Sequence, residues 1–194
     1  MSGGLILITG GVRSGKSRLA ERLAGERGDR VTYIATMEAL DDEVRERIRV
    51  HRNRRPPHWV TVEAPCAVAE AIAERGPTSD AIVVDCLGLL VSNILLRQPA
   101  EMPYAERCAE VLERVRQIAE VAAKVPATVI VVSNEVGWGV VPESLLGRLF
   151  RDAMGWCNQI LAASAGRVFL TVAGIPVDLR ALGGRYPLSG EGLL

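Results

Sequence analysis

Apolar residues gather along this chain in short runs that end at small or polar residues. The runs do not alternate apolar with polar positions, which is typical of parallel strands buried on both faces of a sheet. We therefore predict five strands, at Leu5–Ile8, Val31–Ile34, Ile82–Val84, Val129–Val132 and Val168–Val172.

Helix-length stretches lie between these runs. In the last stretch, apolar residues from Leu145 to Leu161 recur at helical spacing. Alternation of strand and helix predicts an α/β fold, with a mostly parallel sheet covered by helices on both faces. The predicted helices span residues 16–26, 41–53, 65–75, 104–124 and 143–164.

Length and composition fit one ordinary globular domain. The chain has 194 residues, of which 48% are hydrophobic and 24% charged, so disorder and disulfide-stapled miniature folds are excluded. We place the domain at residues 1–180 and predict a Gly-rich tail at 181–194. The 4 cysteines form no C-x-x-C pair, and we interpret them as buried apolar residues in a reducing compartment.

Charge and aromatic content argue against a nucleic-acid partner. Lysine plus arginine and aspartate plus glutamate number 23 each, and only 4% of residues are aromatic, so a steering field and stacking platforms are lacking. The apolar run Leu5–Ile8 is too short for a signal peptide or a membrane span. We therefore expect a cytoplasmic protein with no membrane span.

The first strand leads directly into the phosphate-binding pattern G-x-x-x-x-G-K-S, the P-loop. Its glycines let backbone N–H groups approach a phosphate closely, Lys16 brings positive charge to the β- and γ-phosphates, and the Ser17 hydroxyl binds Mg²⁺. An ordinary Gly-rich turn is the alternative, which the strand before the motif and the helix after it disfavour. The residues expected to hold nucleotide phosphates are Gly10, Gly11, Val12, Arg13, Ser14, Gly15, Lys16 and Ser17.

A carboxylate follows the strand Ile82–Val84. Asp85 stands where a Walker-B carboxylate reaches the Mg²⁺ shell, so we predict that Ser17 and Asp85 form the metal site. The alternative is that Asp85 caps a following helix.

A histidine lies near the end of the helix predicted at 41–53. This helix begins with carboxylates, ends with arginines and stops at Pro56–Pro57. His51 falls on the stripe of Val44 and Ile48 that faces the protein, and a neutral imidazole among cations is a competent nucleophile toward phosphorus. A hydrogen-bonded structural histidine and a solvated arginine face are the alternatives.

These elements together resemble the bifunctional adenosylcobinamide kinase / adenosylcobinamide-phosphate guanylyltransferase family. The order of the motifs makes the resemblance specific, and it extends from about residue 5 to 180. One departure is Gly88-Leu89-Leu90, where the family often has Thr and Trp. The motifs that carry the resemblance are residues 10–17, His51-Arg52-x-x-Arg55-Pro56 with Trp59, Val84-Asp85-Cys86-Leu87 with Ser92-Asn93, and Ser133-Asn134-Glu135-Val136-Gly137-Trp138-Gly139-Val140-Val141-Pro142.

The resemblance implies a RecA-like P-loop domain, commonly a homotrimer, with two activities. ATP or GTP would phosphorylate adenosylcobinamide, and GMP from GTP would then pass to adenosylcobinamide phosphate through a GMP-histidine at His51. His51 and Lys16 are thus the predicted catalytic residues, and GTP, ATP and Mg²⁺ the ligands. Further GTP contacts implied by the resemblance are Ala35, Thr36, Arg52, Asn53, Arg54, Arg55, Glu63 and Asp85, while Asn134 and Glu135 would orient substrate or metal.

Two other functions fit the P-loop alone. One is a P-loop kinase of another small molecule, in which His51 is only structural. The other is a nucleotide-dependent switch that binds nucleotide without transferring any part of it, and whose affinity for a partner changes with nucleotide.

Overall fold

A computed structural model describes residues 3–38 and 55–183 of the chain. Within them a seven-stranded sheet has the order β3-β2-β4-β5-β1-β6-β7, and every pairing is parallel except β6 with β7. The strands are β1 (Leu5–Gly10), β2 (Val31–Ala35), β3 (Val60–Glu63), β4 (Ala81–Asp85), β5 (Thr128–Val132), β6 (Arg167–Val172) and β7 (Ile175–Asp178). The helices are α1 (Lys16–Gly25), α3 (Val68–Arg75), a 3-10 turn η1 (Gly76–Thr78), α4 (Leu87–Arg97), α5 (Tyr104–Lys124) and α6 (Leu145–Ser164).

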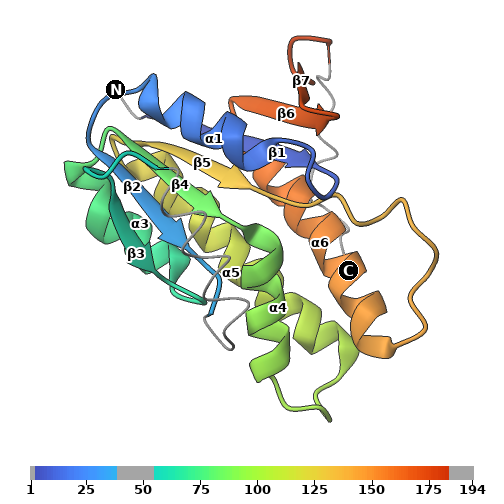
Figure 1. Ribbon diagram of the computed structural model, residues 1–194. Helices are drawn as coiled ribbons and strands as arrows, with labels where there is room; N and C mark the ends of the chain where they lie inside the picture. The colour runs from blue at the N-terminus through green and yellow to red at the C-terminus, as the bar shows by residue number, and fades with distance from the viewer. Residues whose placement is uncertain (1–2, 39–54, 184–194) are drawn as a thin grey trace.

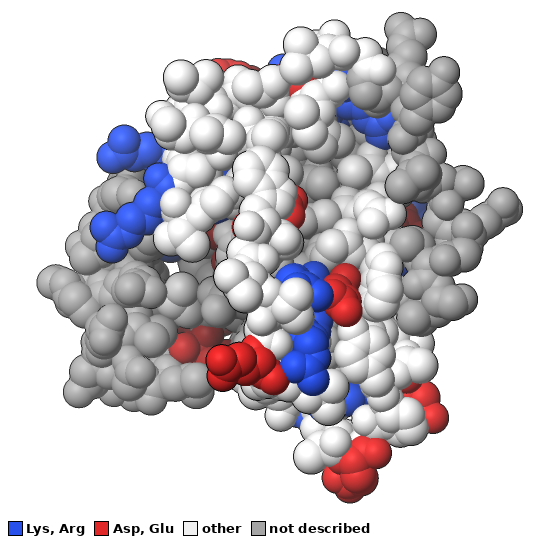
Figure 2. Space-filling view, turned by 90° about the vertical axis from the view of Figure 1, so that its right-hand side faces the viewer, with Lys and Arg blue, Asp and Glu red and all other residues white. Residues whose placement is uncertain are grey.

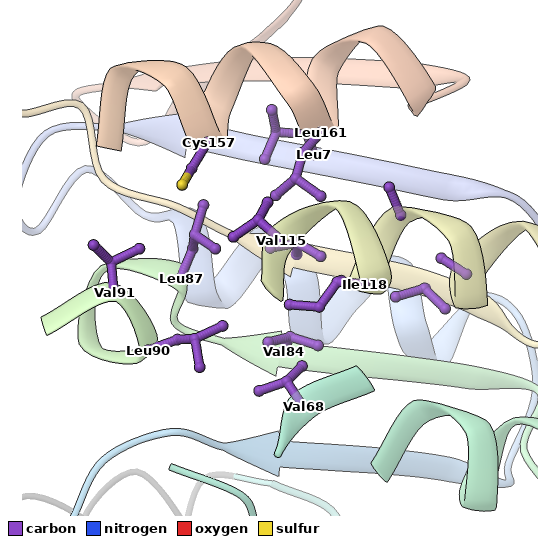
Figure 3. Close-up of a cluster of buried hydrophobic side chains, with 14 of the residues drawn as sticks. Leu7, Val68, Val84, Leu87, Leu90, Val91, Val115, Ile118, Cys157 and Leu161 are labelled. Carbon is purple, nitrogen blue, oxygen red and sulfur yellow. The ribbon is translucent and has the colours of Figure 1, made fainter. Parts of the chain in front are cut away.

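Helices cover both faces of this sheet, as the sequence predicts (Figure 1). α1 packs on one face against β1, β4 and β5, and its buried residues join the strands in one apolar cluster. A larger cluster lies on the other face, where the sheet meets α3, α4, α5 and α6. Figure 3 shows Val115 and Ile118 of α5 and Leu161 of α6 directed at strand residues such as Leu7 and Val84.

Five predicted strands and four predicted helices are confirmed, with boundaries that differ by a few residues. The helix predicted at 104–124 matches α5 at both ends, and the helix predicted from 143 begins at Leu145, where Ser144 caps it by accepting a hydrogen bond from the Gly147 N–H at 3.0 Å. The helix predicted at 41–53 lies outside the described residues.

Besides the short 3-10 turn η1, two strands and one α-helix of the described residues were not predicted. β3 and β7 are four-residue edge strands whose residues are exposed or half-buried, and Pro176 in β7 has no N–H to donate. α4 is apolar on nearly all sides, so it has no helical stripe that periodicity could detect. All three depend on tertiary packing more than on local pattern.

Candidate functional site

The P-loop connects the end of β1 to the start of α1, and two of its glycines are required by geometry. Gly10 has φ 146°, and a Cβ there would lie 2.3 Å from the Thr171 carbonyl oxygen of β6. Gly15, which precedes α1, has φ 100°. Because side-chain-bearing residues rarely adopt these dihedrals, the loop depends on glycine at both positions.

Lys16 is 7% exposed and turns its ammonium group back into the loop. Its Nζ donates hydrogen bonds to the carbonyls of Gly10 at 2.9 Å and Gly11 at 2.7 Å. Burial lowers the pKa of Lys16, whereas the neighbouring Cys86 and Asp85 act to raise it. The positive charge predicted for this loop is therefore held at its centre, close to the end of β4.

Buried hydroxyls beside the loop fit a phosphate-bearing ligand. Within the described part of the chain, the hydroxyls of Ser14 and Thr171 are buried and have no hydrogen-bond partner. Orphaned donors of this kind are costly unless a ligand or water satisfies them. The loop, α1 and the turn between β6 and β7 line a cavity of about 880 Å³, to which Arg13, Arg18 and Arg22 bring positive charge.

The turn between β6 and β7 is tied to the loop by a backbone hydrogen bond. The Gly174 N–H donates to the Ser14 carbonyl at 2.9 Å. On the other side of β1, the Glu135 N–H donates to the Gly10 carbonyl at 3.1 Å. The segments that follow β5 and β6 are thus hydrogen-bonded to the loop at Gly10 and at Ser14.

Asp85 ends β4 at the same edge of the sheet as the P-loop. Its Oδ2 accepts a hydrogen bond of 2.8 Å from the Tyr33 hydroxyl of β2. Asp85 does not cap α4, because the residue at the N-cap is Cys86 and no side chain caps that helix end. A carboxylate beside the phosphate-binding lysine fits a Mg²⁺ ligand.

Neighbouring groups at this edge titrate outside the physiological range. Burial and the charge of Asp85 raise the pKa of Tyr33, so the phenol keeps its proton. Burial also raises the pKa of the Cys86 thiol to about 11. At neutral pH both groups are hydrogen-bond donors without charge.

Thr36, predicted to contact GTP, is fully buried one residue beyond β2. Its hydroxyl donates to the Cys86 carbonyl and accepts from the Cys86 N–H, both at 2.8 Å. Asn93 of α4 donates to the carbonyls of Thr36 at 2.8 Å and Pro65 at 3.0 Å. The Thr36 side chain therefore ties β2 to β4, and its contact with a nucleotide stays a prediction.

Arg55 is 8% exposed, so it does not belong to a solvated arginine face. Its guanidinium carbon lies 3.7 Å from the centre of the Tyr33 ring, and its Nη1 donates to the Thr61 hydroxyl of β3 at 3.1 Å. The sequence alone did not predict this stack, nor did it single out Tyr33 and Thr171 as site residues. Each of these two residues places a hydroxyl inside an otherwise apolar strand, and that was the available signal.

Two of the remaining predicted residues lie at this edge of the sheet, and four lie outside the described part of the chain. Ala35 and Glu63 are paired in register at the ends of β2 and β3, and Glu63 is exposed. His51, Arg52, Asn53 and Arg54 lie outside the described residues.

Within the described residues, no three side chains of His, Cys, Asp or Glu gather to hold a metal ion. Ser17 and Asp85 would therefore bind Mg²⁺ only together with phosphates and water.

The comparison with known proteins identifies the family. A family model described as cobinamide kinase / cobinamide phosphate guanyltransferase matches residues 6–179. The chain belongs to this family. The resemblance drawn from the motifs is thereby confirmed, and so is the prediction that the chain is an enzyme, because the family is named for two transferase activities.

Relatives of this cobinamide kinase family member match nearly end to end. The bifunctional adenosylcobalamin biosynthesis protein CobP of Pseudomonas aeruginosa is 45% identical over 174 residues, which are 90% of this chain and 96% of the relative. The bifunctional adenosylcobalamin biosynthesis protein CobU of Escherichia coli is 41% identical over 181 residues, 91% of this chain and 99% of the relative. The names of these relatives agree with the family match, because both point to adenosylcobalamin biosynthesis.

Solved structures support the predicted fold. The KaiC-like protein PH0186 of Pyrococcus horikoshii superposes with a TM-score of 0.51 at 15% identity, covering 87% of this chain and 71% of that protein. This likeness confirms the RecA-like P-loop fold alone. None of the helices in the described residues is both long and apolar enough to cross a membrane.

Charge on the surface of this family member is mixed. On the face in Figure 2, some Lys and Arg atoms of the described residues lie beside Asp and Glu atoms, and others stand apart from them. Ion pairs among the described residues include Arg97 with Glu38 at 2.6 Å and Arg30 with Asp80 at 2.5 Å. Positive charge gathers instead along the cavity beside the P-loop.

Proposed function

We propose that this protein phosphorylates adenosylcobinamide with ATP or GTP and then transfers GMP from GTP to adenosylcobinamide phosphate, giving adenosylcobinamide-GDP. One observation carries the proposal: a complete P-loop with a buried Lys16 stands beside Asp85 in a chain that belongs to the cobinamide kinase / cobinamide phosphate guanyltransferase family. The relatives named above are called bifunctional, which supports both steps.

In the first step the P-loop residues hold the donor triphosphate. Loop N–H groups and the Lys16 ammonium offset the charge that builds on the phosphate oxygens. The acceptor hydroxyl oxygen bonds to the γ-phosphorus as the bond to the β-phosphate oxygen breaks. The nucleoside diphosphate leaves, and the hydroxyl proton passes to a base or water.

In the second step His51 is the nucleophile. A neutral imidazole nitrogen bonds to the α-phosphorus of GTP as the bond to the β-phosphate oxygen breaks, and pyrophosphate leaves with its charge held by Lys16 and the loop. A phosphate oxygen of the acceptor then bonds to that phosphorus. The nitrogen–phosphorus bond breaks and the imidazole is free again.

Chain connectivity supports this role for His51. Arg55 packs on Tyr33, which contacts Asp85, and position 51 is four residue steps before Arg55 in the sequence. At about 3.5 Å per step, this stretch of chain spans at most roughly 14 Å. The reach of the chain is therefore compatible with a nucleophile at position 51 that acts at this edge of the sheet.

Mg²⁺ would be held by the Ser17 hydroxyl and the Asp85 carboxylate, together with phosphate oxygens and water. When bound, the ion offsets phosphate charge and orients the leaving group.

The proposal also includes further GTP contacts by Ala35, Thr36, Glu63 and residues 52–55. We further propose a cytoplasmic location and a homotrimer, with one domain per chain at residues 1–180. No nucleic-acid partner is part of the proposal.

Product mass tests the proposal directly. Adenosylcobinamide, GTP and Mg²⁺ are incubated with the protein, and the corrinoid is weighed by mass spectrometry. The expected product carries a GDP moiety in place of the hydroxyl hydrogen. A product that gains only phosphate indicates a kinase alone, and an unchanged corrinoid with slow GTP hydrolysis indicates a nucleotide-dependent switch.

A further inference from the structure

A tyrosine supports the predicted metal-binding carboxylate from the neighbouring strand. Tyr33 of β2 is 4% exposed, and its hydroxyl donates to Asp85 Oδ2 at 2.8 Å. β2 and β4 are paired so that Tyr33 lies opposite Val83 and Ala35 lies opposite Asp85. Tyr33 and Asp85 therefore stand diagonally on the same face of the sheet, a span that a tyrosine ring can bridge.

This face is the one that carries α1 and Lys16. Tyr33 and Val83 belong to the apolar cluster that packs under α1. The tyrosine thus reaches Asp85 from the protein interior, while the other carboxylate oxygen, Oδ1, takes no part in this bond. The Tyr33 bond fixes Oδ2 in place, and Oδ1 is the oxygen that would bind a ligand at the end of the strand.

A neutral donor suits this task better than a cation would. An O–H group orients a carboxylate without cancelling the negative charge that a metal needs. A lysine or arginine at the same place would pair with Asp85 and compete with the ion.

Tyr33 contacts Arg55 through the face of its ring. The Arg55 guanidinium lies over the Tyr33 ring, 3.7 Å from the centre, and it also donates to Thr61 on β3. A cation over the ring draws electron density from the phenol, which makes the hydroxyl a stronger donor. Thr61, Arg55, Tyr33 and Asp85 therefore form one continuous chain of contacts across β3, β2 and β4.

We propose that Tyr33 is a positioning residue that presents the Asp85 carboxylate to Mg²⁺, and that the Arg55 cation strengthens this support. The inference deepens the proposed function, because it rests on Asp85 being a metal ligand. It assigns to Tyr33 no contact with nucleotide or corrinoid.

The test uses Tyr33→Phe, which removes one oxygen and keeps the ring beneath Arg55. Mn²⁺ binding in the presence of GTP is titrated by electron paramagnetic resonance, and the Mg²⁺ dependence of corrinoid phosphorylation is measured beside it. The Kd for Mn²⁺ and the half-saturating Mg²⁺ concentration should each rise about tenfold, the range seen when a support behind a metal ligand is removed. The KM for adenosylcobinamide at saturating Mg²⁺ should not change.

Tyr104→Phe is the matched control. The Tyr104 hydroxyl of α5 also donates to a carboxylate, Asp152 of α6, at 2.7 Å, in the α5–α6 contact on the face of the sheet opposite to α1 and Tyr33. It should lower the melting temperature without any change in Mn²⁺ affinity. Arg55→Met, which removes the cation and leaves the Tyr33–Asp85 bond, should weaken Mn²⁺ binding less than Tyr33→Phe does.

Asp85→Asn separates this inference from the proposed function. If Asp85→Asn leaves Mn²⁺ affinity intact, Asp85 is not a metal ligand and the metal site of the proposed function is wrong. If Asp85→Asn weakens Mn²⁺ binding while neither Tyr33→Phe nor Arg55→Met does, the positioning role alone is overturned. Because Arg55→Met keeps the hydrogen bond, it gives an answer even if Tyr33→Phe fails to fold.

Discussion

The N–H of Gly174 donates to the carbonyl of Ser14 at 2.9 Å, so the turn between β6 and β7 is hydrogen-bonded to the P-loop. The turn lies far from the loop in sequence but beside it in the sheet, since β6 pairs with β1 up to Gly10 and Thr171. The shape of the phosphate site therefore depends on the turn between β6 and β7 as well as on residues 10–17.

Gly174→Ala tests this relationship. Gly174 has φ 83°, and a Cβ there meets no atom within 4 Å, so the whole effect comes from backbone strain. We expect a loss of about 1 to 2 kcal/mol in the free energy of unfolding, the cost of a side chain in the left-handed region. The KM for GTP should rise severalfold, measured by initial rates.

Gly155→Ala is the control for that substitution. Gly155 lies within α6, and a Cβ there also has open space. This change should raise the free energy of unfolding by up to about 1 kcal/mol, because alanine favours helix over glycine. An equal rise in the KM for GTP in both variants would contradict a specific role for the turn.

Lys16→Ala should depress both transfer reactions. Lys16 is the cation at the centre of the loop, held by the Gly10 and Gly11 carbonyls. We expect kcat/KM to fall about 100-fold or more for phosphorylation and for guanylyl transfer, in line with the loss of one charge-stabilising donor. Lys124→Ala, at the end of α5, removes the same charge away from the loop and should leave both rates unchanged.

Acid should weaken the contribution of the Arg30–Asp80 pair. Hydrogen bonds from Arg30 lower the pKa of Asp80 from its usual value of 3.8. A lowered carboxyl pKa stabilises the folded state above the unfolded pKa, and this stability is lost as the pH falls through the folded pKa. Asp80→Asn should therefore lower the urea midpoint at pH 7, and the difference from the wild type should shrink below pH 4.

Asp29→Asn is the control for acid stability, because it removes the same charge one residue before Arg30 and leaves the pair intact. A difference between Asp80→Asn and wild type that stays constant down to pH 3 would show that the ion pair is not its source.

Two thiols should be unreactive in the native protein. Cys108 and Cys157 are fully buried between α5 and α6, and burial raises the pKa of Cys157 to about 12. Because the thiolate is the reactive form, neither residue should be labelled by iodoacetamide at pH 8 until guanidinium unfolds the chain. Peptide mapping that finds either one alkylated in the folded protein would contradict the described packing.

Local patterns predicted the parts of the site that are continuous in sequence. Residues 10–17 form one continuous motif and Asp85 ends a run of buried apolar residues, so both could be singled out without a structure, and their roles stay predictions. Parallel strands deliver such strand ends to one edge of the sheet. His51 was singled out by its spacing and by the chemistry of imidazole, and the family resemblance added the GMP-histidine role, which stays a prediction.

The site residues that the sequence did not predict are brought to the site by the order of the strands in the sheet. Tyr33 meets Asp85 across 52 residues because β2 lies beside β4, and Thr171 reaches the loop because β6 lies beside β1. No periodicity in the sequence encodes these neighbours. Arg55 was interpreted from its charge, whereas its burial follows from a cation over an aromatic ring that only the fold brings near.

The covalent route through His51 is the central claim, and retention of label tests it most directly. The protein is mixed with Mg²⁺ and GTP labelled at the α-phosphorus or at the γ-phosphorus, without acceptor, and then denatured and separated from free nucleotide. We predict a bound label that acid removes and base does not, from α-labelled GTP alone, and its absence in His51→Ala. Equal retention of the α-label by wild type and His51→Ala, or no retained α-label in the wild type, would contradict the account.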